Sequence, residues 1–297
     1  MSRHLGSRSF ERSAVWAFVP VAVMVPFTLL ALLVIWLPVG LLTDVRYWWV
    51  LVGFLLAGLP LFYRPFQVRV LTPLVGARRP TPEEAQLIEP LWWQVAQAND
   101  LPPKRYVVRV LPSDELNAFA CGGHLLVVTT FALSELDQRQ LRGVLAHELS
   151  HHLGLHTVAL TIGQWLSVPV VLLARVGFFL QNVAQAATST FGERSPVIQF
   201  ISSVLAVLLQ GFSLIFTAAL TGADALTNLV GHSSEFEADQ RVVKMGFGRE
   251  LASALRLVLA LGDSGRPIGW RARVAASHPP ARTRVARIEA LLRHPAR

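Results

Sequence analysis

The chain has 297 residues, of which 53% are hydrophobic and only 15% are charged, and its formal net charge is +8. Soluble domains usually contain about 25% charged residues, so this composition disfavours an ordinary soluble protein. The basic residues flank apolar stretches and form no basic stripe interleaved with aromatic residues, which argues against a nucleic-acid partner.

The first predicted element is a transmembrane hairpin over residues 14–63, preceded by a short N-terminal segment, residues 1–13. The first run, 14–42, carries no charge, and a helix of this length can cross a hydrocarbon core of about 30 Å with some tilt. A polar turn leads to a second uncharged run, 47–63, which has aromatic residues at both ends, as expected at the two membrane interfaces. A cleaved signal peptide is the alternative, but the first run is too long for one and lacks a clear cleavage site.

Arginines lie on both outer sides of this hairpin, and the turn inside it carries one Asp and one Arg. By the positive-inside rule, the N-terminus and the segment after the hairpin face the cytoplasm. We therefore expect a multi-pass protein of the plasma membrane. The arginines are Arg3, Arg8 and Arg12 before the hairpin and Arg64, Arg69, Arg78 and Arg79 after it.

After the hairpin the sequence takes on the character of a soluble domain. Residues 67–74 are predicted to form a short strand. A helix is expected to run to about residue 99, with Thr81 as its N-cap and Pro82 in its first turn. Pro90 should kink or split this helix.

Strands are expected next. Residues 105–111 are rich in valine and predict one strand. Residues 117–124 lead into 125–130, and we interpret them as two strands joined or bent at a pair of glycines. Cys121, the only cysteine, is interpreted as a small buried hydrophobe; it allows no intramolecular disulfide, which agrees with a reducing compartment.

The following helix carries the motif His147-Glu148-Leu149-Ser150-His151. We expect Ser134 to be its N-cap, with Asp137 at the third helical position. Both histidines lie on one helix face, where two nitrogens can bind a single zinc ion. Glu148 can reach a water in the open position of the metal. The five residues alone also fit two ordinary histidines on an amphipathic helix.

A zinc site of this kind needs a third protein ligand. Glu235 and Asp239 share a helix face, so the first can bind the metal and the second can orient a ligand histidine. A solvated acidic patch is the alternative, which the preceding apolar run in an acid-poor chain disfavours. A third histidine is rejected, because His156 comes one place too early for the pattern that needs it. We interpret His152 and His156 as bystanders.

Two further apolar runs, 157–187 and 197–220, separate the two halves of this expected metal site. We interpret residues 157–226 as a second membrane hairpin. A buried helical pair in a large soluble core is the alternative, since Arg175 interrupts the first run and charges inside spans are rare. Helices are expected beyond it at residues 235–245, 249–261 and 281–293.

Four motifs, in this order, resemble those of one family, the HtpX-type membrane zinc metalloproteases, in the group that also holds the CAAX prenyl endopeptidases. Together they are far more specific than any one of them alone, and two hairpins also fit. The motifs are Asn117-Ala118-Phe119-Ala120, His147-Glu148-Leu149-Ser150-His151, Glu235-Phe236-Glu237-Ala238-Asp239, and Ser277-His278-Pro279-Pro280 with Arg284.

The resemblance implies a mostly α integral membrane protein with two transmembrane hairpins and a gluzincin-like α+β metalloprotease domain. That domain would be built from residues 64–156 and 227–297 and would face the cytoplasm. The resemblance also implies one zinc ion per chain. It implies an edge strand at Asn117, Ala118 and Phe119 that holds a peptide by strand addition.

Two positions depart from the pattern of the family. Ser234 stands where the family often has an arginine just before the glutamate ligand, which leaves the support of that helix open. Val285 stands where isoleucine is usual. Neither residue takes part in the metal chemistry.

The expected reaction is peptide-bond hydrolysis. Zinc held by His147, His151 and Glu235 lowers the pKa of its water to about 7. Glu148 takes the proton of that water and later delivers it to the leaving amine. The pattern of the family makes His278 the candidate for a second donor to the oxyanion, although a histidine beside two prolines also fits a simple turn.

The expected substrate is a polypeptide, either misfolded membrane proteins in quality control or, as the alternative, prenylated peptides. A non-catalytic scaffold that keeps zinc for stability is disfavoured, because structure alone needs no base at Glu148. An intramembrane protease is disfavoured as well. Charged residues such as Glu135 and Arg139 precede the motif, so its helix begins in water.

Overall fold

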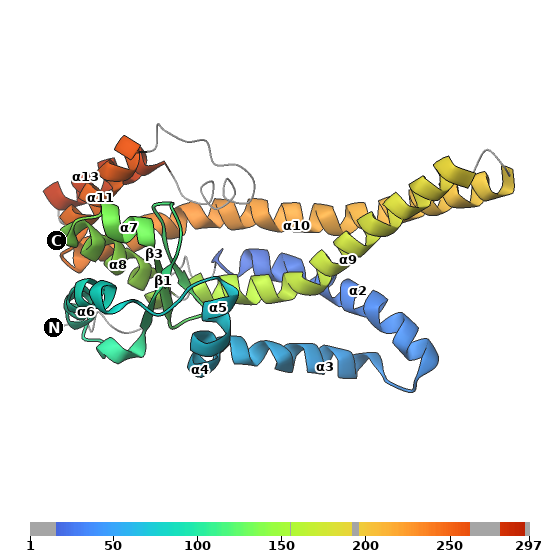
Figure 1. Cartoon of the computed structure of the whole chain (residues 1–297), viewed down its shortest axis with the longest axis horizontal. Helices are drawn as coiled ribbons and strands as arrows, with labels where there is room; N and C mark the ends of the chain where they lie inside the picture. Colours follow the sequence, from blue (N-terminus) through green and yellow to red (C-terminus); the bar gives the residue numbers. More distant parts are fainter. Residues whose placement is uncertain (1–15, 155, 192–195, 262–279, 295–297) are drawn as a thin grey trace. The chain divides into compact units, whose positions relative to one another are not determined.

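The computed structural model describes residues 16–154, 156–191, 196–261 and 280–294. Within these residues the chain is mostly helical and has one small sheet (Figure 1). The predicted turn with His278 lies outside the described residues. The chain divides into two compact units: the first comprises Met1–Phe18, Gly58–Thr161 and Thr227–Arg297, and the second comprises Val19–Ala57 and Ile162–Leu226.

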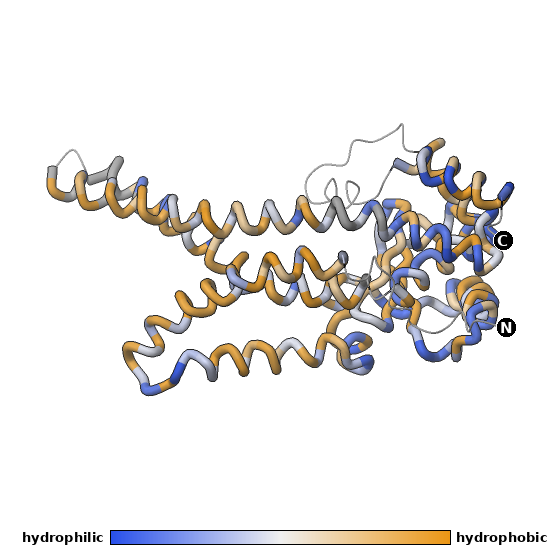
Figure 2. The backbone as a smooth tube through the Cα atoms, turned by 180° about the vertical axis from the view of Figure 1, so that it is seen from behind, coloured by the Kyte–Doolittle hydropathy of each residue, from blue (hydrophilic) through white to orange (hydrophobic). Residues whose placement is uncertain are grey.

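The second unit is built from apolar helices. It contains α2 (Val19–Leu42), most of α3 (Tyr47–Gly58), and parts of α9 (His156–Phe191) and α10 (Pro196–Lys244). Figure 2 shows these helices largely in orange, the colour of hydrophobic residues. Among the described residues, three stretches are long and apolar enough to cross a membrane, or four if a bent pair counts as one span. They are Val19–Leu42, Thr157–Val183 and Gln199–Thr227, and the bent pair is Tyr47–Phe62 with Arg64–Leu74.

A small core holds the helices of the second unit together. Met24 of α2, Val170 of α9 and Phe216 of α10 are buried members of it. The buried hydroxyl of Thr28 lies 2.9 Å from the Met24 carbonyl oxygen and 2.8 Å from that of Leu166, so it links α2 to α9. Many other large apolar side chains on these helices are exposed, as expected where the surroundings are lipid.

The first unit contains a three-stranded sheet with the order β1-β3-β2. β1 (Val107–Leu111) runs parallel to β3 (Leu125–Thr129), and β2 (Ala118–Cys121) runs antiparallel to it. Gly122 and Gly123 make the turn from β2 to β3 at φ values of 71° and 146°, which glycine adopts more readily than other residues. The predicted strands are confirmed, and β2 lies at an edge of the sheet.

Helices of the first unit pack on one face of this sheet. The core joins β3 to α6 (Pro82–Gln97), α8 (Gln138–Leu153), α11 (Gly248–Leu261) and α13 (Ala281–Arg293). Gly143 of α8 lets α11 come close, because a Cβ atom at this position would collide with the backbone of Leu251. The second half of α8 is therefore enclosed, and every residue from 145 to 153 is buried.

The predicted start of α6 is confirmed. The side chain of Thr81 accepts a hydrogen bond from the Glu84 backbone, and the Glu84 carboxylate accepts one from the Thr81 backbone, which forms a capping box. The helix continues through Pro90 to Gln97, so the proline does not split it. Burial of Ile88, Leu91 and their neighbours offsets the loss of one helical hydrogen bond.

The strand predicted at residues 67–74 is wrong. These residues continue the short helix α4 (Arg64–Phe66) as a π-helical turn, η2 (Gln67–Leu71), and a last short helix, α5 (Thr72–Leu74). Gln67 is fully buried, and its side-chain amide donates to the Leu61 carbonyl at 2.7 Å. Tertiary packing of this residue overrides the extended preference of the neighbouring valines.

The predicted N-cap at Ser134 is also wrong. Ser134 lies inside a short helix, α7 (Thr130–Glu135), and the chain is extended at Leu136. Asp137 is the N-cap of α8 rather than its third residue: its carboxylate accepts from the Gln140 backbone at 2.7 Å, and the Gln140 side chain accepts in return from the Asp137 backbone. The sequence offers Ser134 and Asp137 as possible N-caps. Because Leu136 is extended, the long helix begins after Asp137.

The helix expected at residues 235–245 is not a separate element. It forms the last turns of α10, which has 49 residues and runs without a break from the apolar stretch into the first unit. The sequence from residue 197 to 244 contains no proline. A continuous helix is therefore possible where the change in composition suggested a boundary.

Candidate metal centre

The centre is built first from α8. The capping box at Asp137 fixes where this helix begins, and the spacing of four residues places His147 and His151 on the same face. Their Nε2 atoms lie 3.2 Å apart, and both side chains are buried. Glu148, next to the first histidine, is buried as well.

The third member comes from α10. Glu235 places one carboxylate oxygen 3.2 Å from His147 Nε2 and the other 3.2 Å from His151 Nε2. The three ligand atoms all lie within 4.8 Å of one another, so these residues could hold a metal ion. The structure thus brings together two sequence segments that the second apolar pair separates.

This arrangement fits zinc in particular. Ligand atoms about 2.0–2.1 Å from a tetrahedral zinc ion lie roughly 3.3 Å from one another; here the two Nε2 atoms are 3.2 Å apart, and each lies 3.2 Å from a different oxygen of Glu235. Two imidazoles and one carboxylate are a usual donor set for a catalytic zinc ion, whose fourth position stays open for water or substrate.

The electrostatics of the centre also favour a cation. Burial and the Arg284 charge lower the pKa of His147, but the carboxylates of Glu235 and Asp239 outweigh them and raise it to about 9. Burial raises the pKa of Glu235, yet the neighbouring charges of His147 and His151 hold it well below its usual range. A buried pocket whose carboxylates stay ionised attracts a positive ion.

A second layer of residues supports the ligands. Asp239, one helical turn beyond Glu235, lies 3.2 Å from His147 Nδ1, on the side of the ring away from Nε2. Such a carboxylate fixes the tautomer and orientation of a ligand histidine. Arg284 of α13 donates to both Asp239 oxygens, at 2.9 and 2.7 Å, and lies 3.0 Å from Glu235.

Arg284 is the residue whose role was missed by sequence reasoning. It stood in one of the quoted motifs without an assigned function, and the structure shows that it is only 6% exposed. A signal was present in the sequence, because Arg284 lies one turn before the apolar Ile288 in an amphipathic segment; the structure shows that these are the two buried positions of α13. An arginine on the apolar face of an amphipathic helix needs a buried partner.

The arginine absent at Ser234 is not needed to support Glu235 here. The Ser234 side chain is buried and its hydroxyl donates to the Gly231 carbonyl at 3.1 Å. The charge next to Glu235 comes instead from Arg284, on another helix.

His152 lies outside the metal cluster and connects α8 to its neighbours. Its Nε2 atom lies 3.1 Å from the Leu125 carbonyl oxygen, and its Nδ1 atom lies 3.2 Å from the Thr157 hydroxyl. The ring packs on Tyr106 at 5.0 Å between centroids. The side chain of His156 is outside the described part of the structure.

The predicted substrate-binding residues lie at and before β2. The Asn117 carbonyl accepts a hydrogen bond from the Thr129 backbone at 3.0 Å, which anchors the start of the strand. Ala118 packs on the main core, and Phe119 packs on the small cluster at the other face of the sheet. Within the described residues β2 has no strand on its outer side, so its backbone can accept one more.

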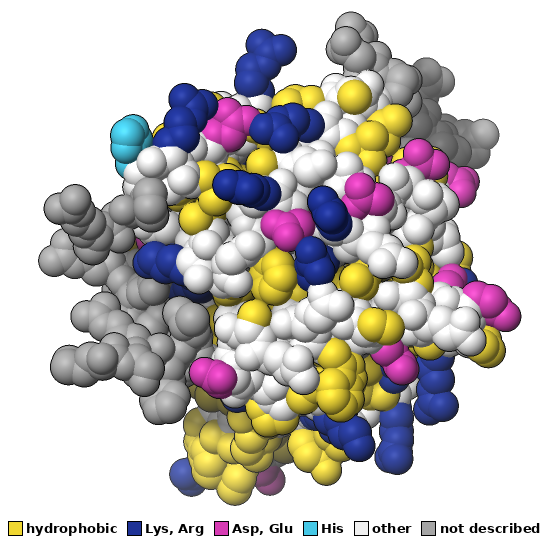
Figure 3. Space-filling model, turned by 90° about the vertical axis from the view of Figure 1, so that its left-hand side faces the viewer, with side chains coloured by type: hydrophobic (Ala, Val, Ile, Leu, Met, Phe, Trp, Pro, Cys, Tyr) yellow, Lys and Arg dark blue, Asp and Glu magenta, His cyan; other side chains and the backbone are white. Residues whose placement is uncertain are grey.

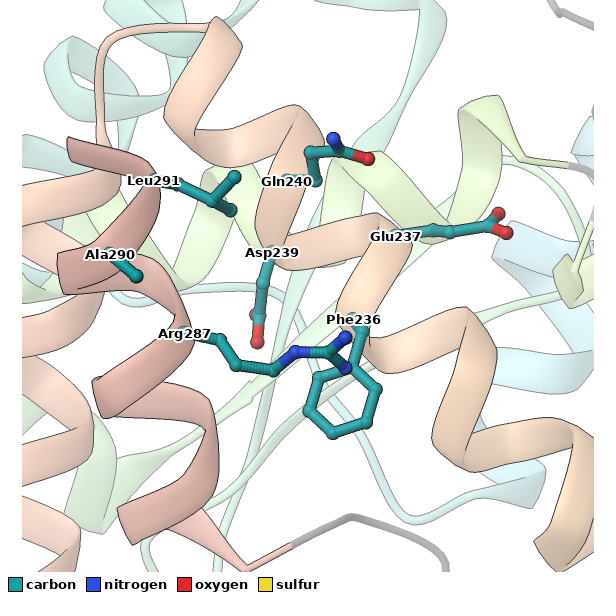
Figure 4. Close-up of a pocket in the computed structure, with 7 residues that line it drawn as sticks. All are labelled: Phe236, Glu237, Asp239, Gln240, Arg287, Ala290 and Leu291. Atoms are coloured by element: carbon teal, nitrogen blue, oxygen red, sulfur yellow. The ribbon is translucent and has the colours of Figure 1, made fainter. Parts of the chain in front are cut away.

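A small pocket lies beside the centre, between α10 and α13. Its volume is about 440 Å³. Figure 4 shows its labelled residues, with the Arg287 guanidinium over the ring of Phe236, at 3.9 Å from the ring centroid. Asp239 also lines it, so the pocket adjoins the support of His147. The lining residues are Phe236, Glu237, Asp239, Gln240, Arg287, Ala290 and Leu291.

Comparisons with known proteins identify the family of this chain. The model of peptidase family M48 matches residues 82–292. A Protease HtpX homolog from Salinibacter ruber is 25% identical over 233 residues, which cover 74% of this chain and 79% of the relative. A Protease HtpX homolog from Acidiphilium cryptum is 28% identical over 221 residues, which cover 66% of this chain and 70% of the relative.

Among solved structures, the crystal structure of S. mikatae Ste24p is similar, with a TM-score of 0.52 and 18% identity. The match covers 86% of this chain, which spans 61% of that protein. At this level of identity the likeness concerns the fold.

Proposed function

The chain belongs to peptidase family M48 and is a metalloprotease, and from this premise we propose that it is a zinc-dependent endopeptidase that cleaves membrane proteins in quality control. The observation that carries the zinc assignment is the set of 3.2 Å separations among His147, His151 and Glu235, next to a buried glutamate that is not part of the set. A purely structural metal site would need no such glutamate.

Each residue of the centre has one role in this proposal. His147, His151 and Glu235 hold the ion, which when bound lowers the pKa of a water molecule and polarises a carbonyl group. Glu148 takes a proton from the attacking water and delivers it to the leaving nitrogen. Asp239 keeps Nε2 of His147 directed at the ion by holding Nδ1.

Substrate binding would use the outer edge of β2. A peptide laid along Ala118 and Phe119 would gain backbone hydrogen bonds, as in other cases of strand addition. Asn117 would contribute where the strand begins. His278 stays the candidate for a second donor to the developing oxyanion.

The apolar helices make the chain a multi-pass membrane protein. We place the first hairpin at residues 14–63 and the second at 157–226, both spanning the plasma membrane. The protease domain, residues 64–156 and 227–297, then faces the cytoplasm. Support comes from arginines on the flanks of the first hairpin and from the exposed apolar side chains of α9 and α10.

Two matched variants test the reaction. Glu148→Gln should retain one zinc ion per chain and lose about a hundredfold to ten-thousandfold in cleavage rate, because the amide cannot accept the proton. Glu235→Gln should lose both zinc and activity. Glu237→Gln, on the same helix and outside the ligand set, is the control and should retain both.

Metal analysis and cleavage of an unfolded membrane protein are the two measurements. Near wild-type cleavage by Glu148→Gln would contradict the role of the base. Zinc-free wild-type protein after gentle purification would contradict the metal site. A proteomic comparison of membranes that contain the active enzyme or Glu148→Gln then identifies substrates, and enrichment of prenylated peptides alone would replace the quality-control assignment.

A further inference from the structure

A second cluster of charged residues lies on the first unit, and it starts beside β1. Arg78 pairs with Val110 in an isolated antiparallel bridge, with N–O distances of 2.7 and 3.0 Å in the two directions. In an antiparallel pair the next residue of one strand lies opposite the preceding residue of the other. Arg79 is therefore a neighbour of Arg109, and their side chains lie on the same face.

Arg109 occupies an unfavourable position for a cation. It is half-buried, its Nη1 atom donates to the Val108 carbonyl at 3.0 Å, and its buried Nε atom has no hydrogen-bond partner among the described residues. Burial, followed by the charges of Arg79 and Arg64, lowers the pKa of this guanidinium. Arg79 and Arg109 lie opposite each other next to the bridge, so their positive charges repel one another, and the charge of Arg64 acts on Arg109 in the same direction.

The described residues supply no carboxylate partner for these arginines. Arg64, Arg79 and Arg109 form no ion pair within the described parts of the chain, and Glu84 is held by Arg78 through two contacts of 2.7 Å. Figure 3 shows a face of the molecule on which both basic and acidic side chains occur. Arginines without a carboxylate partner can form charge-assisted hydrogen bonds with an external anion such as a phosphate.

The sequence position of Arg64 indicates where this anion would come from. Arg64 follows directly on the apolar stretch Tyr47–Phe62, and the helix axis bends by 76° between that stretch and Arg64–Leu74. A chain that leaves the hydrocarbon core passes the phosphate groups of the lipids first. Tyr63, at the bend, is 64% exposed, and tyrosine is enriched at membrane–water interfaces.

We propose that Arg64, Arg79 and Arg109 together bind the phosphate of an anionic phospholipid headgroup. The lipid neutralises three like charges and holds the sheet at the membrane surface. Because β1 and β2 flank the same central strand, the lipid would also set the depth at which the outer edge of β2 is presented. The cluster shares no residue with the metal centre, so this assignment stands apart from the proposed reaction.

The test uses the full chain in nanodiscs of neutral phosphatidylcholine and measures binding of a fluorescent phosphatidylglycerol. The variant is Arg79→Gln with Arg109→Gln, and the control is Arg139→Gln with Arg249→Gln, two exposed arginines with the same change in charge. Each basic residue near a membrane surface contributes roughly fivefold in affinity for anionic lipid. The cluster variant should therefore bind about 25-fold more weakly, and the control should bind like the wild type.

Thermal unfolding in neutral detergent provides a second readout. Without lipid, Arg79→Gln should raise the melting temperature of the protein, because it removes a positive charge next to Arg109. Added phosphatidylglycerol should stabilise the wild type more than this variant. If the double variant does not fold, Arg64→Gln, which changes an exposed side chain, replaces it in both measurements.

Three outcomes would overturn the proposal. Equal weakening in the cluster variant and in the control would mean that net charge alone attracts the lipid. Unchanged binding in the cluster variant would remove the site. Complete displacement of the lipid by millimolar inorganic phosphate, with direct binding of phosphate to protein in neutral nanodiscs, would assign the arginines to a soluble anion instead.

Discussion

The two ends of α10 place opposite kinds of side chain in opposite environments. In the apolar stretch, Val207 and Leu208 are 67% and 64% exposed, whereas in the last turns Glu235 and Asp239 are buried. In water this distribution would be unfavourable at both ends. It becomes favourable when lipid surrounds the first part and when buried partners, together with a metal ion, surround the second.

The comparison separates two sources of stability within one helix. The apolar part depends on the solvent, because its exposed side chains gain from leaving water for hydrocarbon. The polar part depends on particular partners, because every buried charge there must be matched by another. Substitutions in the apolar part should therefore impair membrane insertion, whereas substitutions in the polar part should impair folding and metal binding.

The largest effect is expected from Arg284→Leu, which removes the partner of two buried carboxylates. Breaking a buried ion pair from one side costs about 3–5 kcal/mol, so the variant should melt at a lower temperature and hold less zinc. Thermal unfolding and metal analysis measure the two changes. Arg282→Leu, at an exposed arginine on the same helix, is the matched control, and an equal loss in both variants would contradict the special role of Arg284.

The next largest effect is expected from Leu208→Arg in the apolar part. An arginine at the centre of a membrane span costs about 2.5–3.5 kcal/mol in insertion. The fraction of protein that resists alkaline extraction from membranes should fall clearly. Leu208→Phe should insert normally. If Leu208→Arg inserted as well as the wild type, the stretch would face protein or water rather than lipid.

A smaller effect is expected from Asp239→Asn, which keeps the shape of the side chain and removes its charge. Loss of a residue that orients a metal ligand typically lowers metal affinity about 10–100-fold. Competition with a zinc chelator measures this affinity. Unchanged affinity would mean that the 3.2 Å contact between Asp239 and His147 does not orient the ligand.

The smallest effect is expected from Thr28→Val, which removes the hydroxyl between α2 and α9. Hydrogen bonds between membrane helices contribute about 0.6 kcal/mol on average, so the free energy of unfolding in detergent should fall by a similar amount. Thr43→Val, which affects an exposed hydroxyl just after the end of α2 that donates to the Val39 carbonyl, should change it less. A larger loss at Thr43 than at Thr28 would contradict the link.

Sequence reasoning worked where local chemistry decides the structure. The cap at Thr81, the strands on either side of the glycine turn and the face shared by His147 and His151 all follow from short-range rules. The pairing of Glu235 with the two histidines also came from the sequence, through spacing and acid content. The zinc assignment itself stays a prediction until metal is measured.

Sequence reasoning failed where contacts between residues far apart in the chain determine the structure. Residues 67–74 are helical where Gln67 is buried against Gly122, a residue far along the chain, and no local pattern shows that contact. Arg284 lies 137 residues from the His147 ring that it approaches. Its partners could be inferred only from the rule that a buried charge needs a counter-charge, applied to the helix on which it lies.

The separation of His147 and Arg284 along the chain also determines the order in which the parts of the site are synthesised. Ribosomes add about 5–20 residues per second, so roughly 7–27 seconds pass between synthesis of His147 and synthesis of Arg284, 137 residues later. Glu235, Asp239 and Arg284 all emerge after the second apolar pair has left the ribosome. During translation the two histidines are therefore synthesised before the groups that complete the site. On the proposed set of metal ligands, the site therefore cannot be completed before the apolar helices have been made.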